Sequence, residues 1–160
     1  MLSKQLDILT PLAQLHRISR QIADVASFAV EPGMWVKLDA NGRVENIPTA
    51  AVDALAATDV VELCLSNAVT GELANYEGND TKVGSATTIA EPGTRISVGA
   101  GLIEGTVAIG SKVAVNQAAD ATDGGVSGGG FIVATTGMIV GTVTGVGSMT
   151  EIRLSEPTFV

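Results

Sequence analysis

Short runs of aliphatic and β-branched residues alternate along this chain with clusters of glycine, asparagine, aspartate and serine. This pattern is typical of short antiparallel strands joined by turns. It is clearest between Glu104 and Leu154, where no run has the length or the 3.6-residue period of a good helix. Asn41-Gly42 lies between two extended runs and predicts a tight hairpin. We therefore expect a mainly β fold, a small antiparallel β-barrel or sandwich, over residues 31–160.

Residues 1–30 follow a different pattern. Apolar residues recur there at spacings of three and four, the period of one helix face, at Leu12, Leu15, Ile18, Ile22 and Val25. Thr10 and Pro11 suit the cap and the first turn of that helix. We expect an N-terminal arm that is extended at first and then forms a short amphipathic helix. A helix this short needs a surface to lie on, either the chain's own body or a neighbouring subunit.

One tripeptide occurs twice and breaks the surrounding pattern each time. Glu31-Pro-Gly33 ends the N-terminal region, and Glu91-Pro-Gly93 repeats it sixty positions later, each copy leading into a predicted strand. Either the chain is internally duplicated, or a common turn tripeptide has recurred by chance. We expect one β domain from residue 31 onward, or two small lobes that meet near residue 91.

The chain is acidic, with 17 Asp and Glu against 9 Lys and Arg and a formal net charge of −8. This balance argues against binding to a nucleic-acid backbone, which needs clustered lysine and arginine. Residues 1–30 carry +1, which leaves −9 for the remainder. The split suggests an arm that docks on another acidic surface, although a few solvated arginines would give the same count.

Residue patterns that carry chemistry are weak. The stretch Gly105–Lys112 approaches a phosphate-binding loop, but Ser111 separates its second glycine from the lysine, and a strand-like run follows. His16 is the only histidine, and Cys64, the only cysteine, lies in an apolar run that predicts a buried side chain. Four acidic residues of the polar loops lack the spacing of a calcium loop: Glu77, Asp80, Asp120 and Asp123. We predict no catalytic, cofactor-binding or metal-binding residue, and no enzyme.

Targeting signals are not recognisable in the sequence. Lys4, Gln5 and Asp7 interrupt the first apolar residues, unlike a signal peptide. No run reaches the roughly 18 apolar residues of a membrane span. We expect synthesis in a cytoplasm.

Several turn and strand motifs carry a likeness to a known family. They are Pro32-Gly-x-Trp-Val-x-Leu38 before Asn41-Gly42, Gly110-x-Lys-Val-x-Val115, Gly137-x-Ile-Val-Gly141-Thr-Val143 and Ile152-Arg-Leu154. Their order resembles that of the small head decoration, or capsid cement, proteins of tailed bacteriophages. The resemblance covers residues 31–155 loosely, and the longer helix-like N-terminal stretch departs from it.

The resemblance implies a β-rich protein without enzymatic activity or cofactor. It implies binding to the outer surface of the capsid, where the protein stabilises the virion by bridging neighbouring capsomers after synthesis in the cytoplasm of a host bacterium. The implied partners are the major capsid protein and further copies of the chain, with a homotrimer favoured. No nucleic acid, membrane or small-molecule substrate is expected.

We expect residues 1–30 to pack mainly against another polypeptide, so that deleting residues 1–28 would leave the β domain folded. The predicted partner-binding residues are Leu12, Leu15, Arg17, Ile18, Arg20, Ile22 and Trp35. Trp35, the only tryptophan, anchors either the core or a subunit contact. A β-rich binding module of a tail, fibre or baseplate is the alternative function.

Overall fold

The computed structural model of the chain describes residues 4–24, 28, 30–67, 72–73, 84–89, 91–118 and 129–160. These residues form short strands and one turn of 3-10 helix, and they contain no α-helix. The strands are β1 (Leu6–Ile8), β2 (Ile18–Gln21), β3 (Trp35–Leu38), β4 (Val44–Asn46), β5 (Val61–Cys64), β6 (Ser66–Asn67), β7 (Glu72–Leu73), β8 (Ser85–Ile89), β9 (Arg95–Val98), β10 (Ile103–Glu104), β11 (Lys112–Val115), β12 (Phe131–Val133), β13 (Met138–Val146) and β14 (Thr150–Phe159), and the 3-10 turn η1 is Leu12–Gln14. The prediction of a mainly β fold is confirmed.

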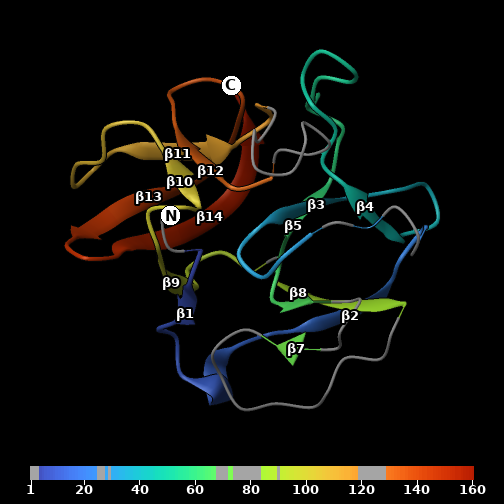
Figure 1. Cartoon of the computed structure of the whole chain (residues 1–160), viewed down its shortest axis with the longest axis horizontal. Coiled ribbons are helices and arrows are strands. Elements are labelled where there is room, and N and C mark those ends of the chain that lie inside the picture. The colour runs from blue at the N-terminus through green and yellow to red at the C-terminus, as the bar shows by residue number, and fades with distance from the viewer. Residues whose placement is uncertain are drawn as a thin grey trace.

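Two sheets build the molecule (Figure 1). Sheet A has seven strands in the order β1-β9-β14-β13-β11-β12-β10, and sheet B has five in the order β2-β8-β5-β3-β4. The pairings are antiparallel except between β10 and β12, and β6 and β7 form a separate small pair. A single hydrophobic cluster contains buried residues of both sheets, so the two sheets share one core.

The central strands of the two sheets pair in the same register. In sheet B, Trp35 of β3 lies opposite Leu63 of β5; in sheet A, Arg95 of β9 lies opposite Arg153 of β14. The next pairs along both ladders keep the same offsets. The edge strand β1 also pairs with β9 in the register in which β4 pairs with β3. The same arrangement of three strands therefore occurs twice, as β4-β3-β5 and as β1-β9-β14.

The repeated tripeptide makes the same turn in both sheets. Its glycine has a positive φ in each copy, 92° at Gly33 and 88° at Gly93, a conformation that favours glycine. The amide of Gly33 donates to the carbonyl of Cys64, and the amide of Gly93 donates to that of Leu154, both at 2.8 Å. In each case the accepting residue donates back to the residue after the glycine. The turn thus sets the register of the strand that follows it.

The prediction of an N-terminal amphipathic helix is wrong. Residues Leu6–Ile8 and Ile18–Gln21 are strands, which add an edge to sheet A on β9 and an edge to sheet B on β8. The three-residue η1 lies between them, and Val25 is outside the described residues. A short helix is marginal alone, and two sheet edges offer the backbone a full set of partners. Residues 4–24 therefore belong to the same body as the rest of the chain.

Strand β5 is buried on both faces because sheet B curls. Ile22, directly after β2, forms a parallel bridge with Val44 of β4, so the two edges of the sheet meet there. All four residues of Val61–Cys64 are buried, one face inside the curl and the other toward sheet A. On that second face Trp35 meets Phe131 of β12 edge to face, with ring centroids 5.7 Å apart. This contact joins the two sheets.

The two equivalent glycines allow a matched test of this packing. A Cβ at Gly33 would lie 2.5 Å from Cδ1 of the buried Leu102, whereas a Cβ at Gly93 would meet nothing within 4 Å. We expect Gly93→Ala to lower the free energy of unfolding by about 1–2 kcal/mol, because of its φ alone. Gly33→Ala should cost about 1–3 kcal/mol more through overpacking. Urea unfolding measures both; equal losses would contradict the close approach at Gly33.

A second matched pair tests whether β1 is part of the body. Leu6 is 3% exposed and Leu9 is 39% exposed. We expect Leu6→Ala to lower the free energy of unfolding by about 2–5 kcal/mol, as for a core leucine. Leu9→Ala should change it by less than about 0.5 kcal/mol. A Leu6→Ala variant as stable as the parent in urea would show that β1 is not held in sheet A.

Candidate interaction surfaces and the polar contacts beside them

The described residues bring no evident reactive cluster together. Within this part of the chain, no three His, Cys, Asp or Glu side chains are placed to share a metal ion, and no helix is long and apolar enough to cross a membrane. The Cys64 side chain is buried, as its apolar run predicted. The four loop acids considered for calcium, Glu77, Asp80, Asp120 and Asp123, lie outside the described residues.

Three of the residues predicted to bind a partner lie in the core. Leu15 is 9% exposed, Ile22 7% and Trp35 2%. Their apolar surface is already covered by the chain itself, because β1 and β2 place the N-terminal segment across both sheets. Of the two roles predicted for Trp35, the structure supports the core anchor.

The other predicted partner-binding residues are scattered around η1 and β2. Arg17 is exposed, Ile18 is half-buried in β2, and Arg20 is partly buried on the same face of that strand. Leu12 lies in η1, and its side chain is outside the described part. These residues do not form the continuous apolar stripe that a docking helix would present.

Arg20 is held by a buried carboxylate that sequence reasoning missed. Its Nε and Nη2 donate to the two oxygens of Glu62, at 3.0 and 2.9 Å, and Thr88 Oγ1 donates to the same carboxylate at 2.8 Å. The hydrogen bond to Glu62 keeps the pKa of the guanidinium above its usual value. Glu62 is 2% exposed, so removing its partners would leave a buried carboxylate without compensation. The only sequence signal was a lone acid inside the apolar run 60–65.

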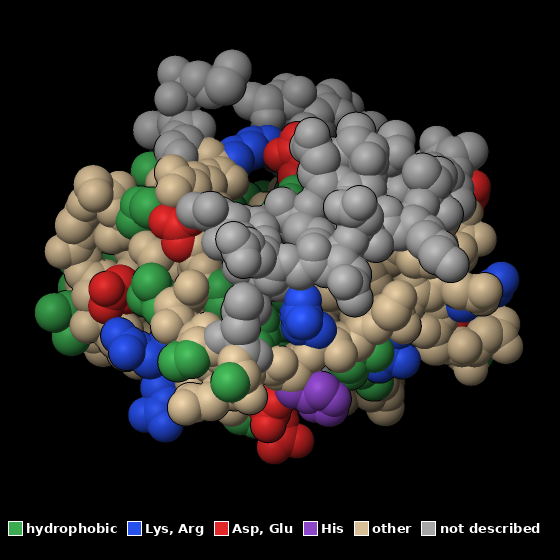
Figure 2. Space-filling model, turned by 90° about the horizontal axis from the view of Figure 1, so that it is seen from below, with side chains coloured by type: hydrophobic (Ala, Val, Ile, Leu, Met, Phe, Trp, Pro, Cys, Tyr) green, Lys and Arg blue, Asp and Glu red, His purple; other side chains and the backbone are tan. Residues whose placement is uncertain are grey.

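Exposed apolar side chains lie mainly on loops and at strand ends. The most exposed in the described part of the chain are Val52 (82%), Ile109 (73%) and Val160 (64%). Figure 2 shows apolar, acidic and basic side chains interspersed over one face of the molecule. Scattered single residues of this kind are normal for a soluble surface, so exposure alone assigns no site.

A groove of about 340 Å³ lies beside β4. Its lining combines acidic and apolar side chains, from Asp24, Phe28, Glu45, Pro48, Val52 and Asp53. Asp53 already pairs with Lys37 at 3.2 Å. The groove is therefore lined by both carboxylates and apolar side chains, among them the exposed Val52.

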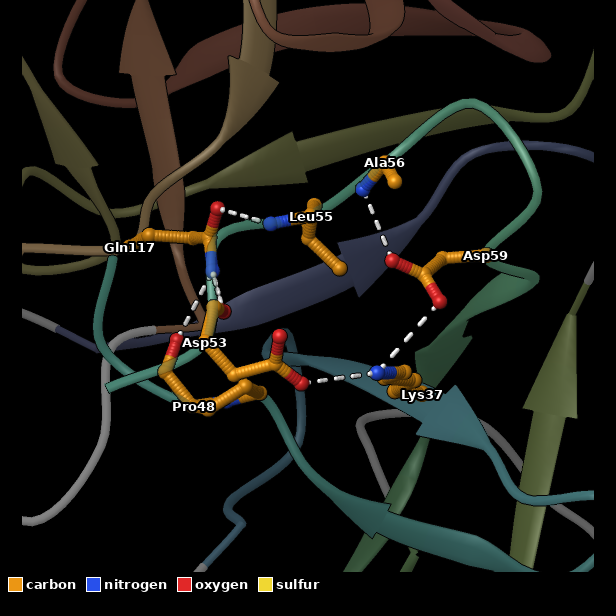
Figure 3. Close-up of polar contacts among 7 residues, drawn as sticks. All are labelled: Lys37, Pro48, Asp53, Leu55, Ala56, Asp59 and Gln117. Carbon is orange, nitrogen blue, oxygen red and sulfur yellow. Dashed lines mark hydrogen bonds and ion pairs between the residues drawn. The ribbon is translucent and has the colours of Figure 1, made fainter. Parts of the chain in front are cut away.

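The loop that forms one wall of this groove is pinned by polar contacts (Figure 3). Lys37 lies between Asp53, at 3.2 Å, and Asp59, at 3.3 Å. Partial burial acts to lower the pKa of Lys37, but the hydrogen bonds and charges of the two aspartates outweigh it and raise that pKa. The Lys37 charge therefore fixes two points of the loop to β3.

Gln117 fixes the same loop to sheet A. Its amide oxygen accepts from the Leu55 amide at 2.9 Å, and its Nε2 donates to the carbonyls of Pro48 and Asp53 at 2.9 and 3.1 Å (Figure 3). Gln117 follows β11 of sheet A, whereas the loop connects β4 and β5 of sheet B. This contact spans more than sixty positions of sequence, which no local pattern could reveal.

The hairpin predicted at Asn41-Gly42 is present and is organised by Asp39. The Asp39 carboxylate accepts from the amides of Asn41 and Arg43, both at 2.9 Å, and from Arg43 Nε at 3.0 Å. The backbone hydrogen bond from Arg43 is the main reason why the pKa of Asp39 is lowered. Gly42 completes the turn with a φ of 73°.

Comparison with known proteins finds no counterpart: no protein family, curated protein or solved structure matches this chain. Relatives therefore contribute no functional residues. The likeness to capsid decoration proteins depends only on the turn and strand motifs quoted from the sequence.

The buried carboxylate of Glu62 can be tested by an isosteric change. Glu62→Gln removes the charge that Arg20 and Thr88 bind, so we expect the free energy of unfolding to fall by about 1.5–3 kcal/mol. Glu156→Gln, at an exposed position, is the control and should change it by less than about 0.5 kcal/mol. Similar urea midpoints for the two variants would show that the Arg20 contact contributes little.

The lowered pKa of Asp39 gives a pH dependence with a definite sign. Because the native state holds this proton less tightly than the unfolded chain, the stabilisation is complete above the usual pKa of 3.8 and is lost as pH falls through the lower native value. The Asp39→Asn variant lacks this titrating carboxyl group. We expect the difference in urea midpoint between parent and variant to shrink between pH 6 and about pH 2. A difference that stays constant with pH would contradict this role.

Proposed function

We propose that this protein is a structural virion protein that decorates the outer surface of a tailed-phage capsid. The observation that supports it is where the family-like motifs lie. Gly110 and Gly137 form positive-φ turns directly before β11 and β13, and Ile152–Leu154 lies at the centre of β14. The motifs that carry the resemblance thus fall on the framework of one β body, which we take to be a sandwich of the two sheets.

A protein with this architecture can stabilise a shell by bridging its subunits. Its two sheets share one core, and Lys37 and Gln117 fix the long loop between β4 and β5. A body of this kind would hold neighbouring capsomers at a set spacing. Since it binds the assembled shell and not separated subunits, it shifts the equilibrium toward assembly. Many weak contacts at high copy number then act together.

The proposed partners are the major capsid protein and further copies of the chain, with a trimer favoured. Because Leu15, Ile22 and Trp35 are buried within the chain, the contacts are assigned to other surfaces. Exposed side chains on separate elements, such as Ile109 and Val160, are available for them. This differs from the sequence-based picture of a detached arm.

Addition to shells that lack the protein tests the proposal. Purified protein is mixed with such capsids, the particles are sedimented, and their thermal disruption is followed by light scattering. We expect a fixed ratio of protein to capsomer in the pellet and disruption at a higher temperature. Absence of the protein from the pellet at all concentrations tested would overturn the proposal.

A β-rich module of a tail, fibre or baseplate is the second candidate. The observation that favours it is the repeated arrangement of the Glu-Pro-Gly turns and the strands after them, since repeats are common in extended assemblies. Electron microscopy of virions labelled on this protein separates the two. Label on the head supports decoration, and label on the tail supports this second function.

A further inference from the structure

A row of basic side chains crosses the outer face of sheet A. Arg95 of β9 lies opposite Arg153 of β14, Arg153 lies opposite Thr142 of β13, and Thr142 lies opposite Lys112 of β11. Residues opposite one another in a sheet share a face, and adjacent strands are about 4.8 Å apart. The basic row, defined as Arg95, Arg153 and Lys112, therefore extends for about 14 Å across four strands.

The basic row faces solvent rather than the core. Arg95, Arg153 and Lys112 are exposed, whereas the alternate positions Ile96, Ile152 and Val113 are fully buried. The row is thus a surface feature of the sheet.

Two members of the row have no acidic partner among the described residues. Arg95 lies 3.7 Å from Glu151, but Lys112 donates only to the neutral Thr142, at 3.0 Å. No carboxylate of the described chain lies within ion-pair distance of Lys112 or Arg153, whereas four basic residues elsewhere are paired: Lys4, Arg20, Lys37 and Arg43. In a chain with 17 acids and 9 bases, two exposed bases without an acidic partner in the described part of the chain stand out.

The arrangement also opposes stability. Arg95 and Arg153 are direct cross-strand neighbours, and like charges in that position destabilise a sheet. The matching pair in sheet B is Trp35 and Leu63, so the register does not require charge there. Features that break a local rule without a structural gain are often functional.

The charge pattern of this face also limits what fits on it. One step along the strands, a second row on the same face contains Asp7, Ser97 and Glu151. Repeated phosphates on both sides of the basic row would meet these acids, which disfavours nucleic acid. A narrow line of carboxylates on a folded partner would meet only the bases, so the pattern favours an acidic protein surface.

We propose that the basic row is a docking surface for a line of carboxylates on a partner protein. The inference rests on the proposed function, because in the virion the partner surface is that of the capsid shell. Arg153 and Lys112 make the main contacts, since both are exposed and neither has an acidic partner within the described ranges. Arg95 makes a weaker contact, because its charge is partly neutralised by Glu151.

A double charge reversal with a matched control tests this surface. Arg153→Glu with Lys112→Glu is compared with a control that carries Gln14→Glu, Gln21→Glu, Ala51→Glu and Ala57→Glu, which lowers the net charge equally at exposed sites off this face. Co-sedimentation with shells that lack the protein gives the affinity, and thermal unfolding of the free variants reports their fold. We expect at least a tenfold loss of affinity for the first variant, less than twofold for the control, and no fall in unfolding temperature for the first variant.

The outcomes separate this inference from the proposed function. If the parent binds shells and both variants bind equally well, the docking surface is wrong and the proposed function stands. If the parent does not bind shells, the proposed function fails, and binding to poly-L-glutamate at low salt decides the surface. If only the first variant loses binding to poly-L-glutamate, the basic row is supported as the docking surface. If the parent does not bind poly-L-glutamate, this docking surface is wrong. Equal or tighter binding of the parent to a DNA duplex would also overturn an acidic protein as partner.

Discussion

Packing of sheet B against sheet A through one core is the constraint on which the rest of this structure depends. Aromatic residues are only 3% of the chain, and the contact between Trp35 and Phe131 places two of them at the junction of the sheets. Glycine lets the backbones approach there: a Cβ at Gly129 would lie 3.2 Å from the Trp35 carbonyl, and one at Gly130 would lie 2.7 Å from that of Leu102. Small branched side chains fill the remaining space, which suits a thin and closely packed interior.

The N-terminal segment connects the two sheets at their edges. It supplies β1 to sheet A and β2 to sheet B, and two of its side chains reach the acids of the repeated turns. Lys4 lies 3.7 Å from Glu31, and His16 lies 3.7 Å from Glu91. Exposed pairs of this kind contribute little energy, so the two added strands are the main link. A segment expected to reach a neighbour thus completes the chain's own sheets.

The sequence was informative wherever structure is local. The hairpin at Asn41-Gly42 and the strands within 104–154 follow from turn residues and β-branched runs, and both are present. The helix predicted from Leu12 to Ile22 is wrong, because apolar residues can also recur every three or four positions where short strands and a turn alternate. The deciding factor was the free edge of β8, which lies more than sixty positions away and pairs with Ile18–Gln21.

Nonlocal polar contacts were equally hidden from sequence. Glu62 accepts a hydrogen bond from Arg20, which lies 42 positions away in the sequence, and Gln117 accepts one from Leu55, 62 positions away. The basic row is another case, because only the register of four strands brings Arg95, Arg153 and Lys112 together. Surface chemistry of this kind depends on topology, which a fold class alone does not give.

Hydrogen exchange of the free protein is the most direct test of whether the N-terminal segment belongs to the body. If β1 and β2 are edge strands of the two sheets, their hydrogen-bonded amides should be protected together with those of β9 and β8. Amides of residues 5–22 that exchange at the rate of an unfolded chain, while β9 and β14 stay protected, would contradict this. The segment would then be a detached arm, and the shared core would have to form without it.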